Sequence, residues 1–160
     1  MPYLRPLLVI VAFTTAALFS RAEAPPVRVL VWDEQQPEQK QAYGEKFLGE
    51  TIAAHLAQQP GVTVKSTNLD APEQGLDEAT LDATDVLIWW AHKKVPALTD
   101  ANAERVAVRV REGRLGFIAL HSAHWAKPFV RLMQDRAKAD ASNFQGLHRP
   151  ILAALGCRTH

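Results

Sequence analysis

Two apolar runs that stop at histidine constrain the fold of this chain most strongly. Residues 85–92 (DVLIWWAH) and 116–125 (GFIALHSAHW) each hold an unbroken apolar stretch that is followed by polar residues. Such a run is typical of a strand buried on both faces, as in a parallel sheet. Ligands of open parallel α/β sheets bind outside the carboxyl ends of the strands. The sequence therefore predicts that these histidines lie where such a fold keeps its chemistry.

The rest of the chain alternates between strand and helix patterns. Residues 27–32 (VRVLVW) and 62–67 (VTVKST) are rich in β-branched residues and predict two further strands. Apolar residues at helical spacing predict helices over residues 45–58 and 99–112. Two more helices are expected, one over residues 77–83 with Asp77 as its cap and one over residues 125–137. Strands that alternate with helices indicate a parallel sheet with right-handed crossovers.

The N-terminal segment has the pattern of a signal peptide. Arg5 precedes an apolar stretch over residues 7–19, and small residues follow at positions 20, 22 and 24. The stretch is shorter than the roughly 20 residues that a membrane-spanning helix needs. We therefore expect residues 1–24 to be removed and the protein to be periplasmic or secreted, with no stable membrane insertion after cleavage. An uncleaved anchor is the alternative.

The composition fits one ordinary globular domain of 160 residues, with 48% apolar and 22% charged residues. A formal charge of +1 without a basic cluster gives no reason to expect a nucleic-acid partner. The only cysteine, Cys157, excludes a disulfide within the chain and lies outside every predicted strand–turn–helix unit. The oligomeric state stays open, a homo-oligomer included.

The end of the fourth predicted strand carries the residues best suited to catalysis. His121, Ser122 and His124 lie on a strand-to-helix turn, where nucleophile elbows are built. A hydroxyl group between two imidazoles could be activated by general-base catalysis. His121 and His124, with His92 from the third strand, would equally suit a divalent metal such as zinc. The alternative is structural, with Ser122 capping the next helix and the histidines bonded to the backbone.

Aromatic and acidic residues at the same edge point to carbohydrate. Indole rings stack on sugar faces, and carboxylates accept hydrogen bonds from sugar hydroxyls. The candidate substrate-binding residues are Trp32, Asp33, Glu34, Trp90 and Trp125. Trp89, which alternates with Trp90, is expected to pack in the core. For Glu34, a solvated loop charge is the alternative interpretation.

Three of these segments resemble the ThuA-like, or trehalose-utilisation, family of the class I glutamine amidotransferase-like superfamily. They are residues 29–34 (VLVWDE), 85–92 and 120–125 (LHSAHW), and residues 69–76 (LDAPEQGL) look like the exit loop of the family's second strand. The resemblance implies a flavodoxin-like three-layer sandwich with a mainly parallel sheet. It also implies a role in the use of trehalose-type disaccharides or sugar derivatives. It does not imply glutaminase activity, because His121 stands where the superfamily has its nucleophilic cysteine.

The chain departs from the family pattern in places. Ala91 and Ala123 stand where the family usually has glycine, and members usually extend well beyond this length. We therefore expect a ThuA-like domain over residues 25–138, shortened at the C-terminus, and an irregular tail over 139–160. The leading hypothesis is an exported domain that acts on or binds a sugar. A non-catalytic carbohydrate-binding module and an inactive truncated product are the alternatives.

Overall fold

The computed structural model describes the backbone of residues 24–154 and the side chains of residues 24–142. The predicted signal peptide, apart from Ala24, lies outside the described residues, and so does Cys157. Within the described part of the chain, no helix combines the length and the apolar character needed to cross a membrane.

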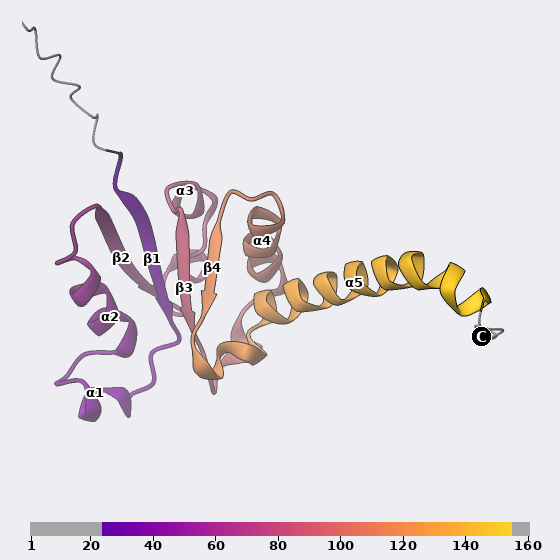
Figure 1. Cartoon of the computed structure of the whole chain (residues 1–160). Helices are drawn as coiled ribbons and strands as arrows, with labels where there is room; N and C mark the ends of the chain where they lie inside the picture. The colour runs from indigo at the N-terminus through magenta and orange to yellow at the C-terminus, as the bar shows by residue number, and fades with distance from the viewer. Residues whose placement is uncertain (1–23, 155–160) are drawn as a thin grey trace, which may run out of the picture.

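Four parallel strands form one sheet in the order β2-β1-β3-β4 (Figure 1). The strands are β1 (Val27–Asp33), β2 (Val62–Asn68), β3 (Val86–Trp90) and β4 (Gly116–Ala119). Each of them coincides closely with a strand that the sequence predicts. The predicted α/β class with a parallel, flavodoxin-like sheet is therefore confirmed.

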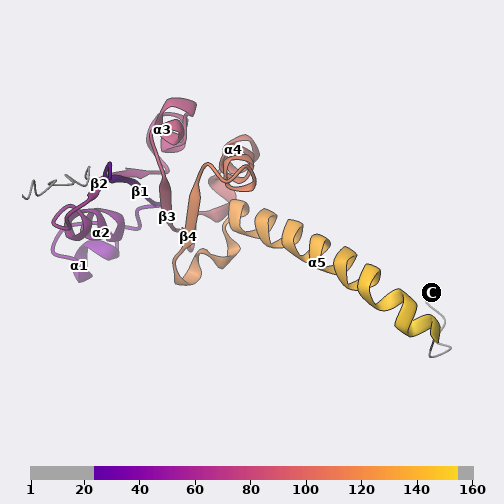
Figure 2. The same cartoon turned by 45° about the horizontal axis from the view of Figure 1, so that its top comes forward.

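Helices cover both faces of the sheet. The helix α2 packs on β1 and β2, whereas α3 and α4 lie on the opposite face (Figures 1 and 2). The α-helices are α1 (Gln39–Ala42), α2 (Leu48–Leu56), α3 (Glu78–Asp82), α4 (Asp100–Arg111) and α5 (Lys127–Ala154). Short 3-10 helices η1 (Pro72–Gly75), η2 (Val95–Ala97) and η3 (His121–Trp125) lie in the connections. This arrangement gives the three layers that the family resemblance implies.

The main hydrophobic core lies between the sheet and the α3–α4 layer. Leu30 and Leu87 lie side by side on neighbouring strands, and Leu81 of α3 and Val106 of α4 belong to the same core cluster. The other face of the sheet is covered by α2 only over β1 and β2. Ile118 of β4 therefore keeps 48% of its surface exposed.

Side-chain caps set the starts of the two helices in the core layer. The Asp77 carboxylate accepts a hydrogen bond from the Thr80 backbone N–H at 2.9 Å, which confirms the predicted cap of α3. The Thr99 hydroxyl accepts one from the Asn102 N–H at 3.2 Å and starts α4. These caps fix the residues at which α3 and α4 begin, directly after the loops that follow β2 and β3.

The tail that the sequence predicts to be irregular from residue 139 is helical as far as Ala154. It continues α5, which extends away from the sheet (Figures 1 and 2). The segment over residues 134–141 (QDRAKADA) holds strong helix formers, and Arg136 pairs with Asp140 one turn later at 2.9 Å. The prediction failed because it relied on an apolar stripe, whereas propensity and charge pairing continue the helix here.

Candidate functional site

The loops that follow β3 and β4 begin at the same edge of the sheet. The Leu120 backbone N–H donates to the Trp89 carbonyl oxygen at 2.9 Å, which joins the two strand ends. His92 follows β3, while His121 and His124 lie in η3 directly after β4, and all three side chains are exposed. The predicted placement of these histidines at the carboxyl edge is therefore confirmed.

Trp125 is the most accessible large side chain at this edge. It keeps 67% of its surface exposed, and its ring lies 5.0 Å from the His124 ring at an angle of 47°. An exposed indole is the type of side chain that stacks on a sugar. Of the predicted substrate-binding residues, Trp125 is thus the most exposed, and its sugar-binding role stays a prediction.

The turn at His121 is sharp and strained. His121 has a φ of +38°, in the left-handed region that residues other than glycine seldom adopt. Strain of this kind costs about 1–3 kcal/mol and is concentrated at functional sites. The turn exposes the His121 side chain but buries Ser122, which is 7% exposed. Ser122 is therefore not presented to solvent as the predicted nucleophile would be.

The predicted metal site is not formed. Among the described residues, no group of three or more His, Cys, Asp or Glu side chains is arranged to hold a metal ion. His92, His121 and His124 come from two separate loops. The Nδ1 atom of His124 lies 3.2 Å from the His121 carbonyl oxygen, as the structural alternative expects. These residues do not fit a bound zinc ion.

Asp33 binds the protein's own backbone instead of a sugar. It is 1% exposed, its Oδ2 accepts from the Gly49 N–H at 2.7 Å, and its Oδ1 accepts from the Gln35 N–H at 2.7 Å. The first contact caps the N-terminus of α2. Gly49 is required there because a Cβ atom at that position would lie 2.7 Å from the Asp33 Cβ. The predicted substrate-binding role of Asp33 is wrong in this structure.

Glu34 ties the end of β1 to the loop after β3. The side chain is fully buried, and its Oε1 and Oε2 accept from the Lys93 and Lys94 backbone N–H groups at 2.7 and 2.8 Å. The Gln36 side-chain amide also donates to Oε1. Glu34 is therefore neither a solvated loop charge nor a sugar ligand, but the anchor of the loop that carries His92.

Trp32 is also unavailable to a sugar. Parallel pairing places Trp32 beside Trp89 on one face of the sheet, so their rings stack with centroids 3.9 Å apart. Trp32 is 1% exposed and donates its indole N–H to the Gln74 carbonyl at 2.8 Å. Trp89 lies in the core as the sequence predicts. Trp90 points to the opposite face and is half-buried.

The partners that hold this edge together escaped the sequence reasoning. They are backbone N–H groups of Gly49, Lys93 and Lys94, which lie 16 to 60 residues from the carboxylates that they contact. The one available signal was the position of two adjacent carboxylates directly after a buried strand. Carboxylates in this position can accept hydrogen bonds from loop N–H groups as readily as from a ligand.

The pKa values of the two neighbouring carboxyl groups, Asp33 and Glu34, are expected to shift in opposite directions. Burial raises the pKa of Asp33 above its ordinary value, although hydrogen bonds from Gly49 and Gln35 oppose the shift. Burial also disfavours ionised Glu34, but hydrogen bonds from Lys93, Gln36 and the rest of the loop outweigh it and lower its pKa. Carboxyl ¹³C shifts followed by NMR from pH 2 to 7 measure both values directly.

The sign of each contribution to stability follows from these directions. The Glu34 contribution is present above the pKa of the unfolded chain and is lost as pH falls through the lower folded value. The Asp33 contribution is present below its unfolded pKa and is lost as pH rises through the raised folded value. A folded-state pKa of Glu34 above its ordinary value of 4.5, or of Asp33 below its ordinary value of 3.8, would contradict these assignments.

An all-parallel sheet in the order 2-1-3-4, with its loops gathered at the carboxyl edge, defines a flavodoxin-like α/β domain. The family model for ThuA, trehalose utilisation, matches residues 28–152. The chain belongs to the ThuA (trehalose utilisation) family. No curated protein matches it.

Proposed function

We propose that this chain is an exported, sugar-binding member of the ThuA family without glutaminase activity. Its site would lie at the carboxyl edge of β3 and β4 and take a trehalose-type disaccharide or a sugar derivative. The observation that carries the proposal is the exposed Trp125 ring beside His124 at that edge. The connection of the family with trehalose utilisation supports the choice of sugar. The pattern of residues 1–24 supports export.

The side chains around Trp125 supply what a sugar needs. The indole face would stack on the pyranose ring, and imidazole nitrogens of His121, His124 and His92 would exchange hydrogen bonds with its hydroxyls. The loop that carries His92 is fixed from within, because Glu34 accepts hydrogen bonds from its backbone. A site of this kind binds through stacking and neutral hydrogen bonds.

An enzyme and a binding module remain the two candidates for this site. As an enzyme, the chain would use His121 and His124 as the acid–base pair, since both are exposed on one turn. The module is favoured by the burial of Ser122. We expect no glutaminase activity, because His121 stands where the superfamily has its nucleophilic cysteine. The turn after the fourth strand therefore lacks the thiol that this reaction needs.

Replacing Trp125 with alanine is expected to weaken trehalose binding by about tenfold, because the stacking surface is lost. Isothermal titration calorimetry with trehalose, sucrose and maltose measures the change and ranks the sugars. Met133→Ala is the matched control, because Met133 is also exposed (47%) but lies on α5. Equal affinities of the wild-type chain and the Trp125→Ala variant for trehalose would contradict the proposed site.

Turnover separates the two candidates. Chromatography of trehalose incubated with the wild-type chain should show products if the chain is an enzyme, and His121→Ala should abolish them while binding persists. Trehalose that is bound and recovered unchanged identifies a binding module. Both outcomes leave the carboxyl-edge site in place.

A further inference from the structure

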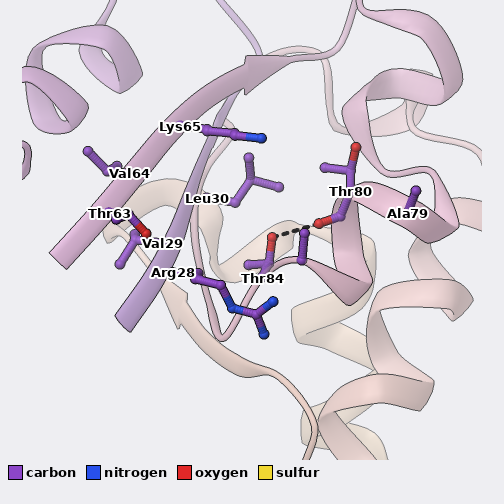
Figure 3. Close-up of a pocket in the computed structure, with 10 residues that line it drawn as sticks. Arg28, Val29, Leu30, Thr63, Val64, Lys65, Ala79, Thr80 and Thr84 are labelled. Atoms are coloured by element: carbon purple, nitrogen blue, oxygen red, sulfur yellow. Dashed lines mark hydrogen bonds between the residues drawn. The ribbon is translucent and has the colours of Figure 1, made fainter. Parts of the chain in front are cut away.

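A hollow lies away from the carboxyl edge, between α3 and the first residues of β1 and β2. Its volume is about 460 Å³, and neither the family match nor the predicted site accounts for it. Arg28 and Thr63 pair at the second positions of β1 and β2, so the hollow lies toward the amino ends of the strands. Figure 3 shows Lys65 and Arg28 reaching from the strands toward Thr80 and Thr84 on the α3 side. We call this site the α3 hollow.

The charge of the α3 hollow favours an anion. No lining residue is acidic, and two lining residues are basic. The Arg28 guanidinium is already neutralised by Asp85, whose Oδ1 lies 2.6 Å from Nη2. Among the described residues, the Lys65 ammonium has neither an ion pair nor a hydrogen bond, and in Figure 3 it extends over the hollow. One uncompensated positive charge thus faces the space where a ligand would lie.

The hydroxyl groups of the α3 hollow favour a ligand that donates hydrogen bonds. Thr84 is buried and donates to the Thr80 carbonyl at 2.8 Å (Figure 3). The Thr80 hydroxyl donates its proton to Asp77 Oδ2 at 2.6 Å, and its oxygen keeps lone pairs that can accept from a ligand hydroxyl. Ala79 and Ala83, which are both exposed, add an apolar lining that suits the face of a sugar ring.

We propose that the α3 hollow is a second small-molecule site and that it takes an anionic monosaccharide, a sugar phosphate or a sugar acid. Lys65 binds the anionic group, the partly buried Thr80 accepts a hydrogen bond from a ring hydroxyl, and the apolar lining contacts the ring. This site is separate from the edge that holds Trp125. Its ligand must carry a negative charge, which trehalose lacks, so this ligand differs from that of the proposed carboxyl-edge site.

The first test compares charged and neutral sugars on the ¹⁵N-labelled full chain by NMR. Glucose 6-phosphate and glucuronate are expected to shift the backbone amides of Thr63, Thr80 and Thr84, and glucose is expected to bind at least about tenfold more weakly. Equal binding of glucose would overturn the proposal, as would shifts confined to Trp125 and its neighbours. Inorganic phosphate that binds as tightly as glucose 6-phosphate would overturn the sugar part.

The second test removes the charge alone. Lys65→Met keeps the length of the side chain and is expected to weaken glucose 6-phosphate binding by about tenfold. Lys46→Met is the control, because Lys46 is exposed and distant from the lining of the hollow. Ala79→Leu keeps the charge but fills the hollow, and it should abolish binding. Unchanged affinity in both Lys65→Met and Ala79→Leu would overturn the proposal, whereas trehalose binding should be unaffected by either.

Discussion

Replacing Trp89 with alanine is expected to lower the free energy of unfolding by about 3–5 kcal/mol. The side chain is 1% exposed, stacks on Trp32 and contacts Phe117 with a ring-centroid distance of 6.1 Å. Its removal leaves a cavity in the centre of the core on the α3–α4 face. Domains of this size are stable by about 5–15 kcal/mol, so the variant loses a large share of its stability. Urea unfolding followed by far-ultraviolet circular dichroism measures the change.

The adjacent tryptophan provides the matched control. Trp90 has the same size and lies one residue further along β3, but it points to the other face and is half-buried. We expect Trp90→Ala to cost less than half as much as Trp89→Ala. Trp89→Phe should be well tolerated, because the indole N–H of Trp89 has no hydrogen-bond partner to lose. Equal costs at positions 89 and 90 would show that the sheet does not present the two faces described.

Replacing Glu34 with alanine is expected to cost about 2–3 kcal/mol and to release the loop after β3. The substitution leaves the Lys93 and Lys94 backbone N–H groups without the acceptor that now lies 2.7 and 2.8 Å away. Their amide hydrogens should therefore exchange faster than in the wild-type chain, and mass spectrometry or NMR can measure the rates.

Glu38→Ala is the control for this prediction. Glu38 also contacts the loop, through the Lys93 Nζ at 2.9 Å, but its side chain is 66% exposed. An exposed ion pair contributes little to stability, and it does not hold the backbone. We expect Glu38→Ala to leave the exchange rates of the loop unchanged. Protection at Lys93 and Lys94 that survives Glu34→Ala would contradict the anchoring role.

The positions of the four strands could be predicted from the sequence because each strand carries a local signal, whereas their order in the sheet could not. The runs VRVLVW, DVLIWW and GFIAL are apolar and bounded by polar residues, and the helices between them require a parallel sheet. The carboxyl edge followed from that topology. His92 and His121 therefore lie where the sequence predicts them, after β3 and β4.

The fate of the polar residues at that edge could not be predicted, because their partners are distant in the sequence. Asp33 and Glu34 look like ligand-binding residues until α2 and the loop after β3 supply N–H groups to both. Trp32 looked accessible because its position at a strand end is visible in the sequence, whereas its register with Trp89 is not. The α3 hollow has no sequence motif, since its lining comes from three separate elements.

The contact between Glu34 and the loop has a consequence for which residues this loop can accept. The carboxylate holds positions 93 and 94 through main-chain N–H groups, which are common to all amino acids except proline. Nineteen residue types at either position thus preserve both hydrogen bonds to Glu34, and a proline at either position would remove one of them. The outward side chains of this turn are therefore free to diversify while the position of His92 stays the same.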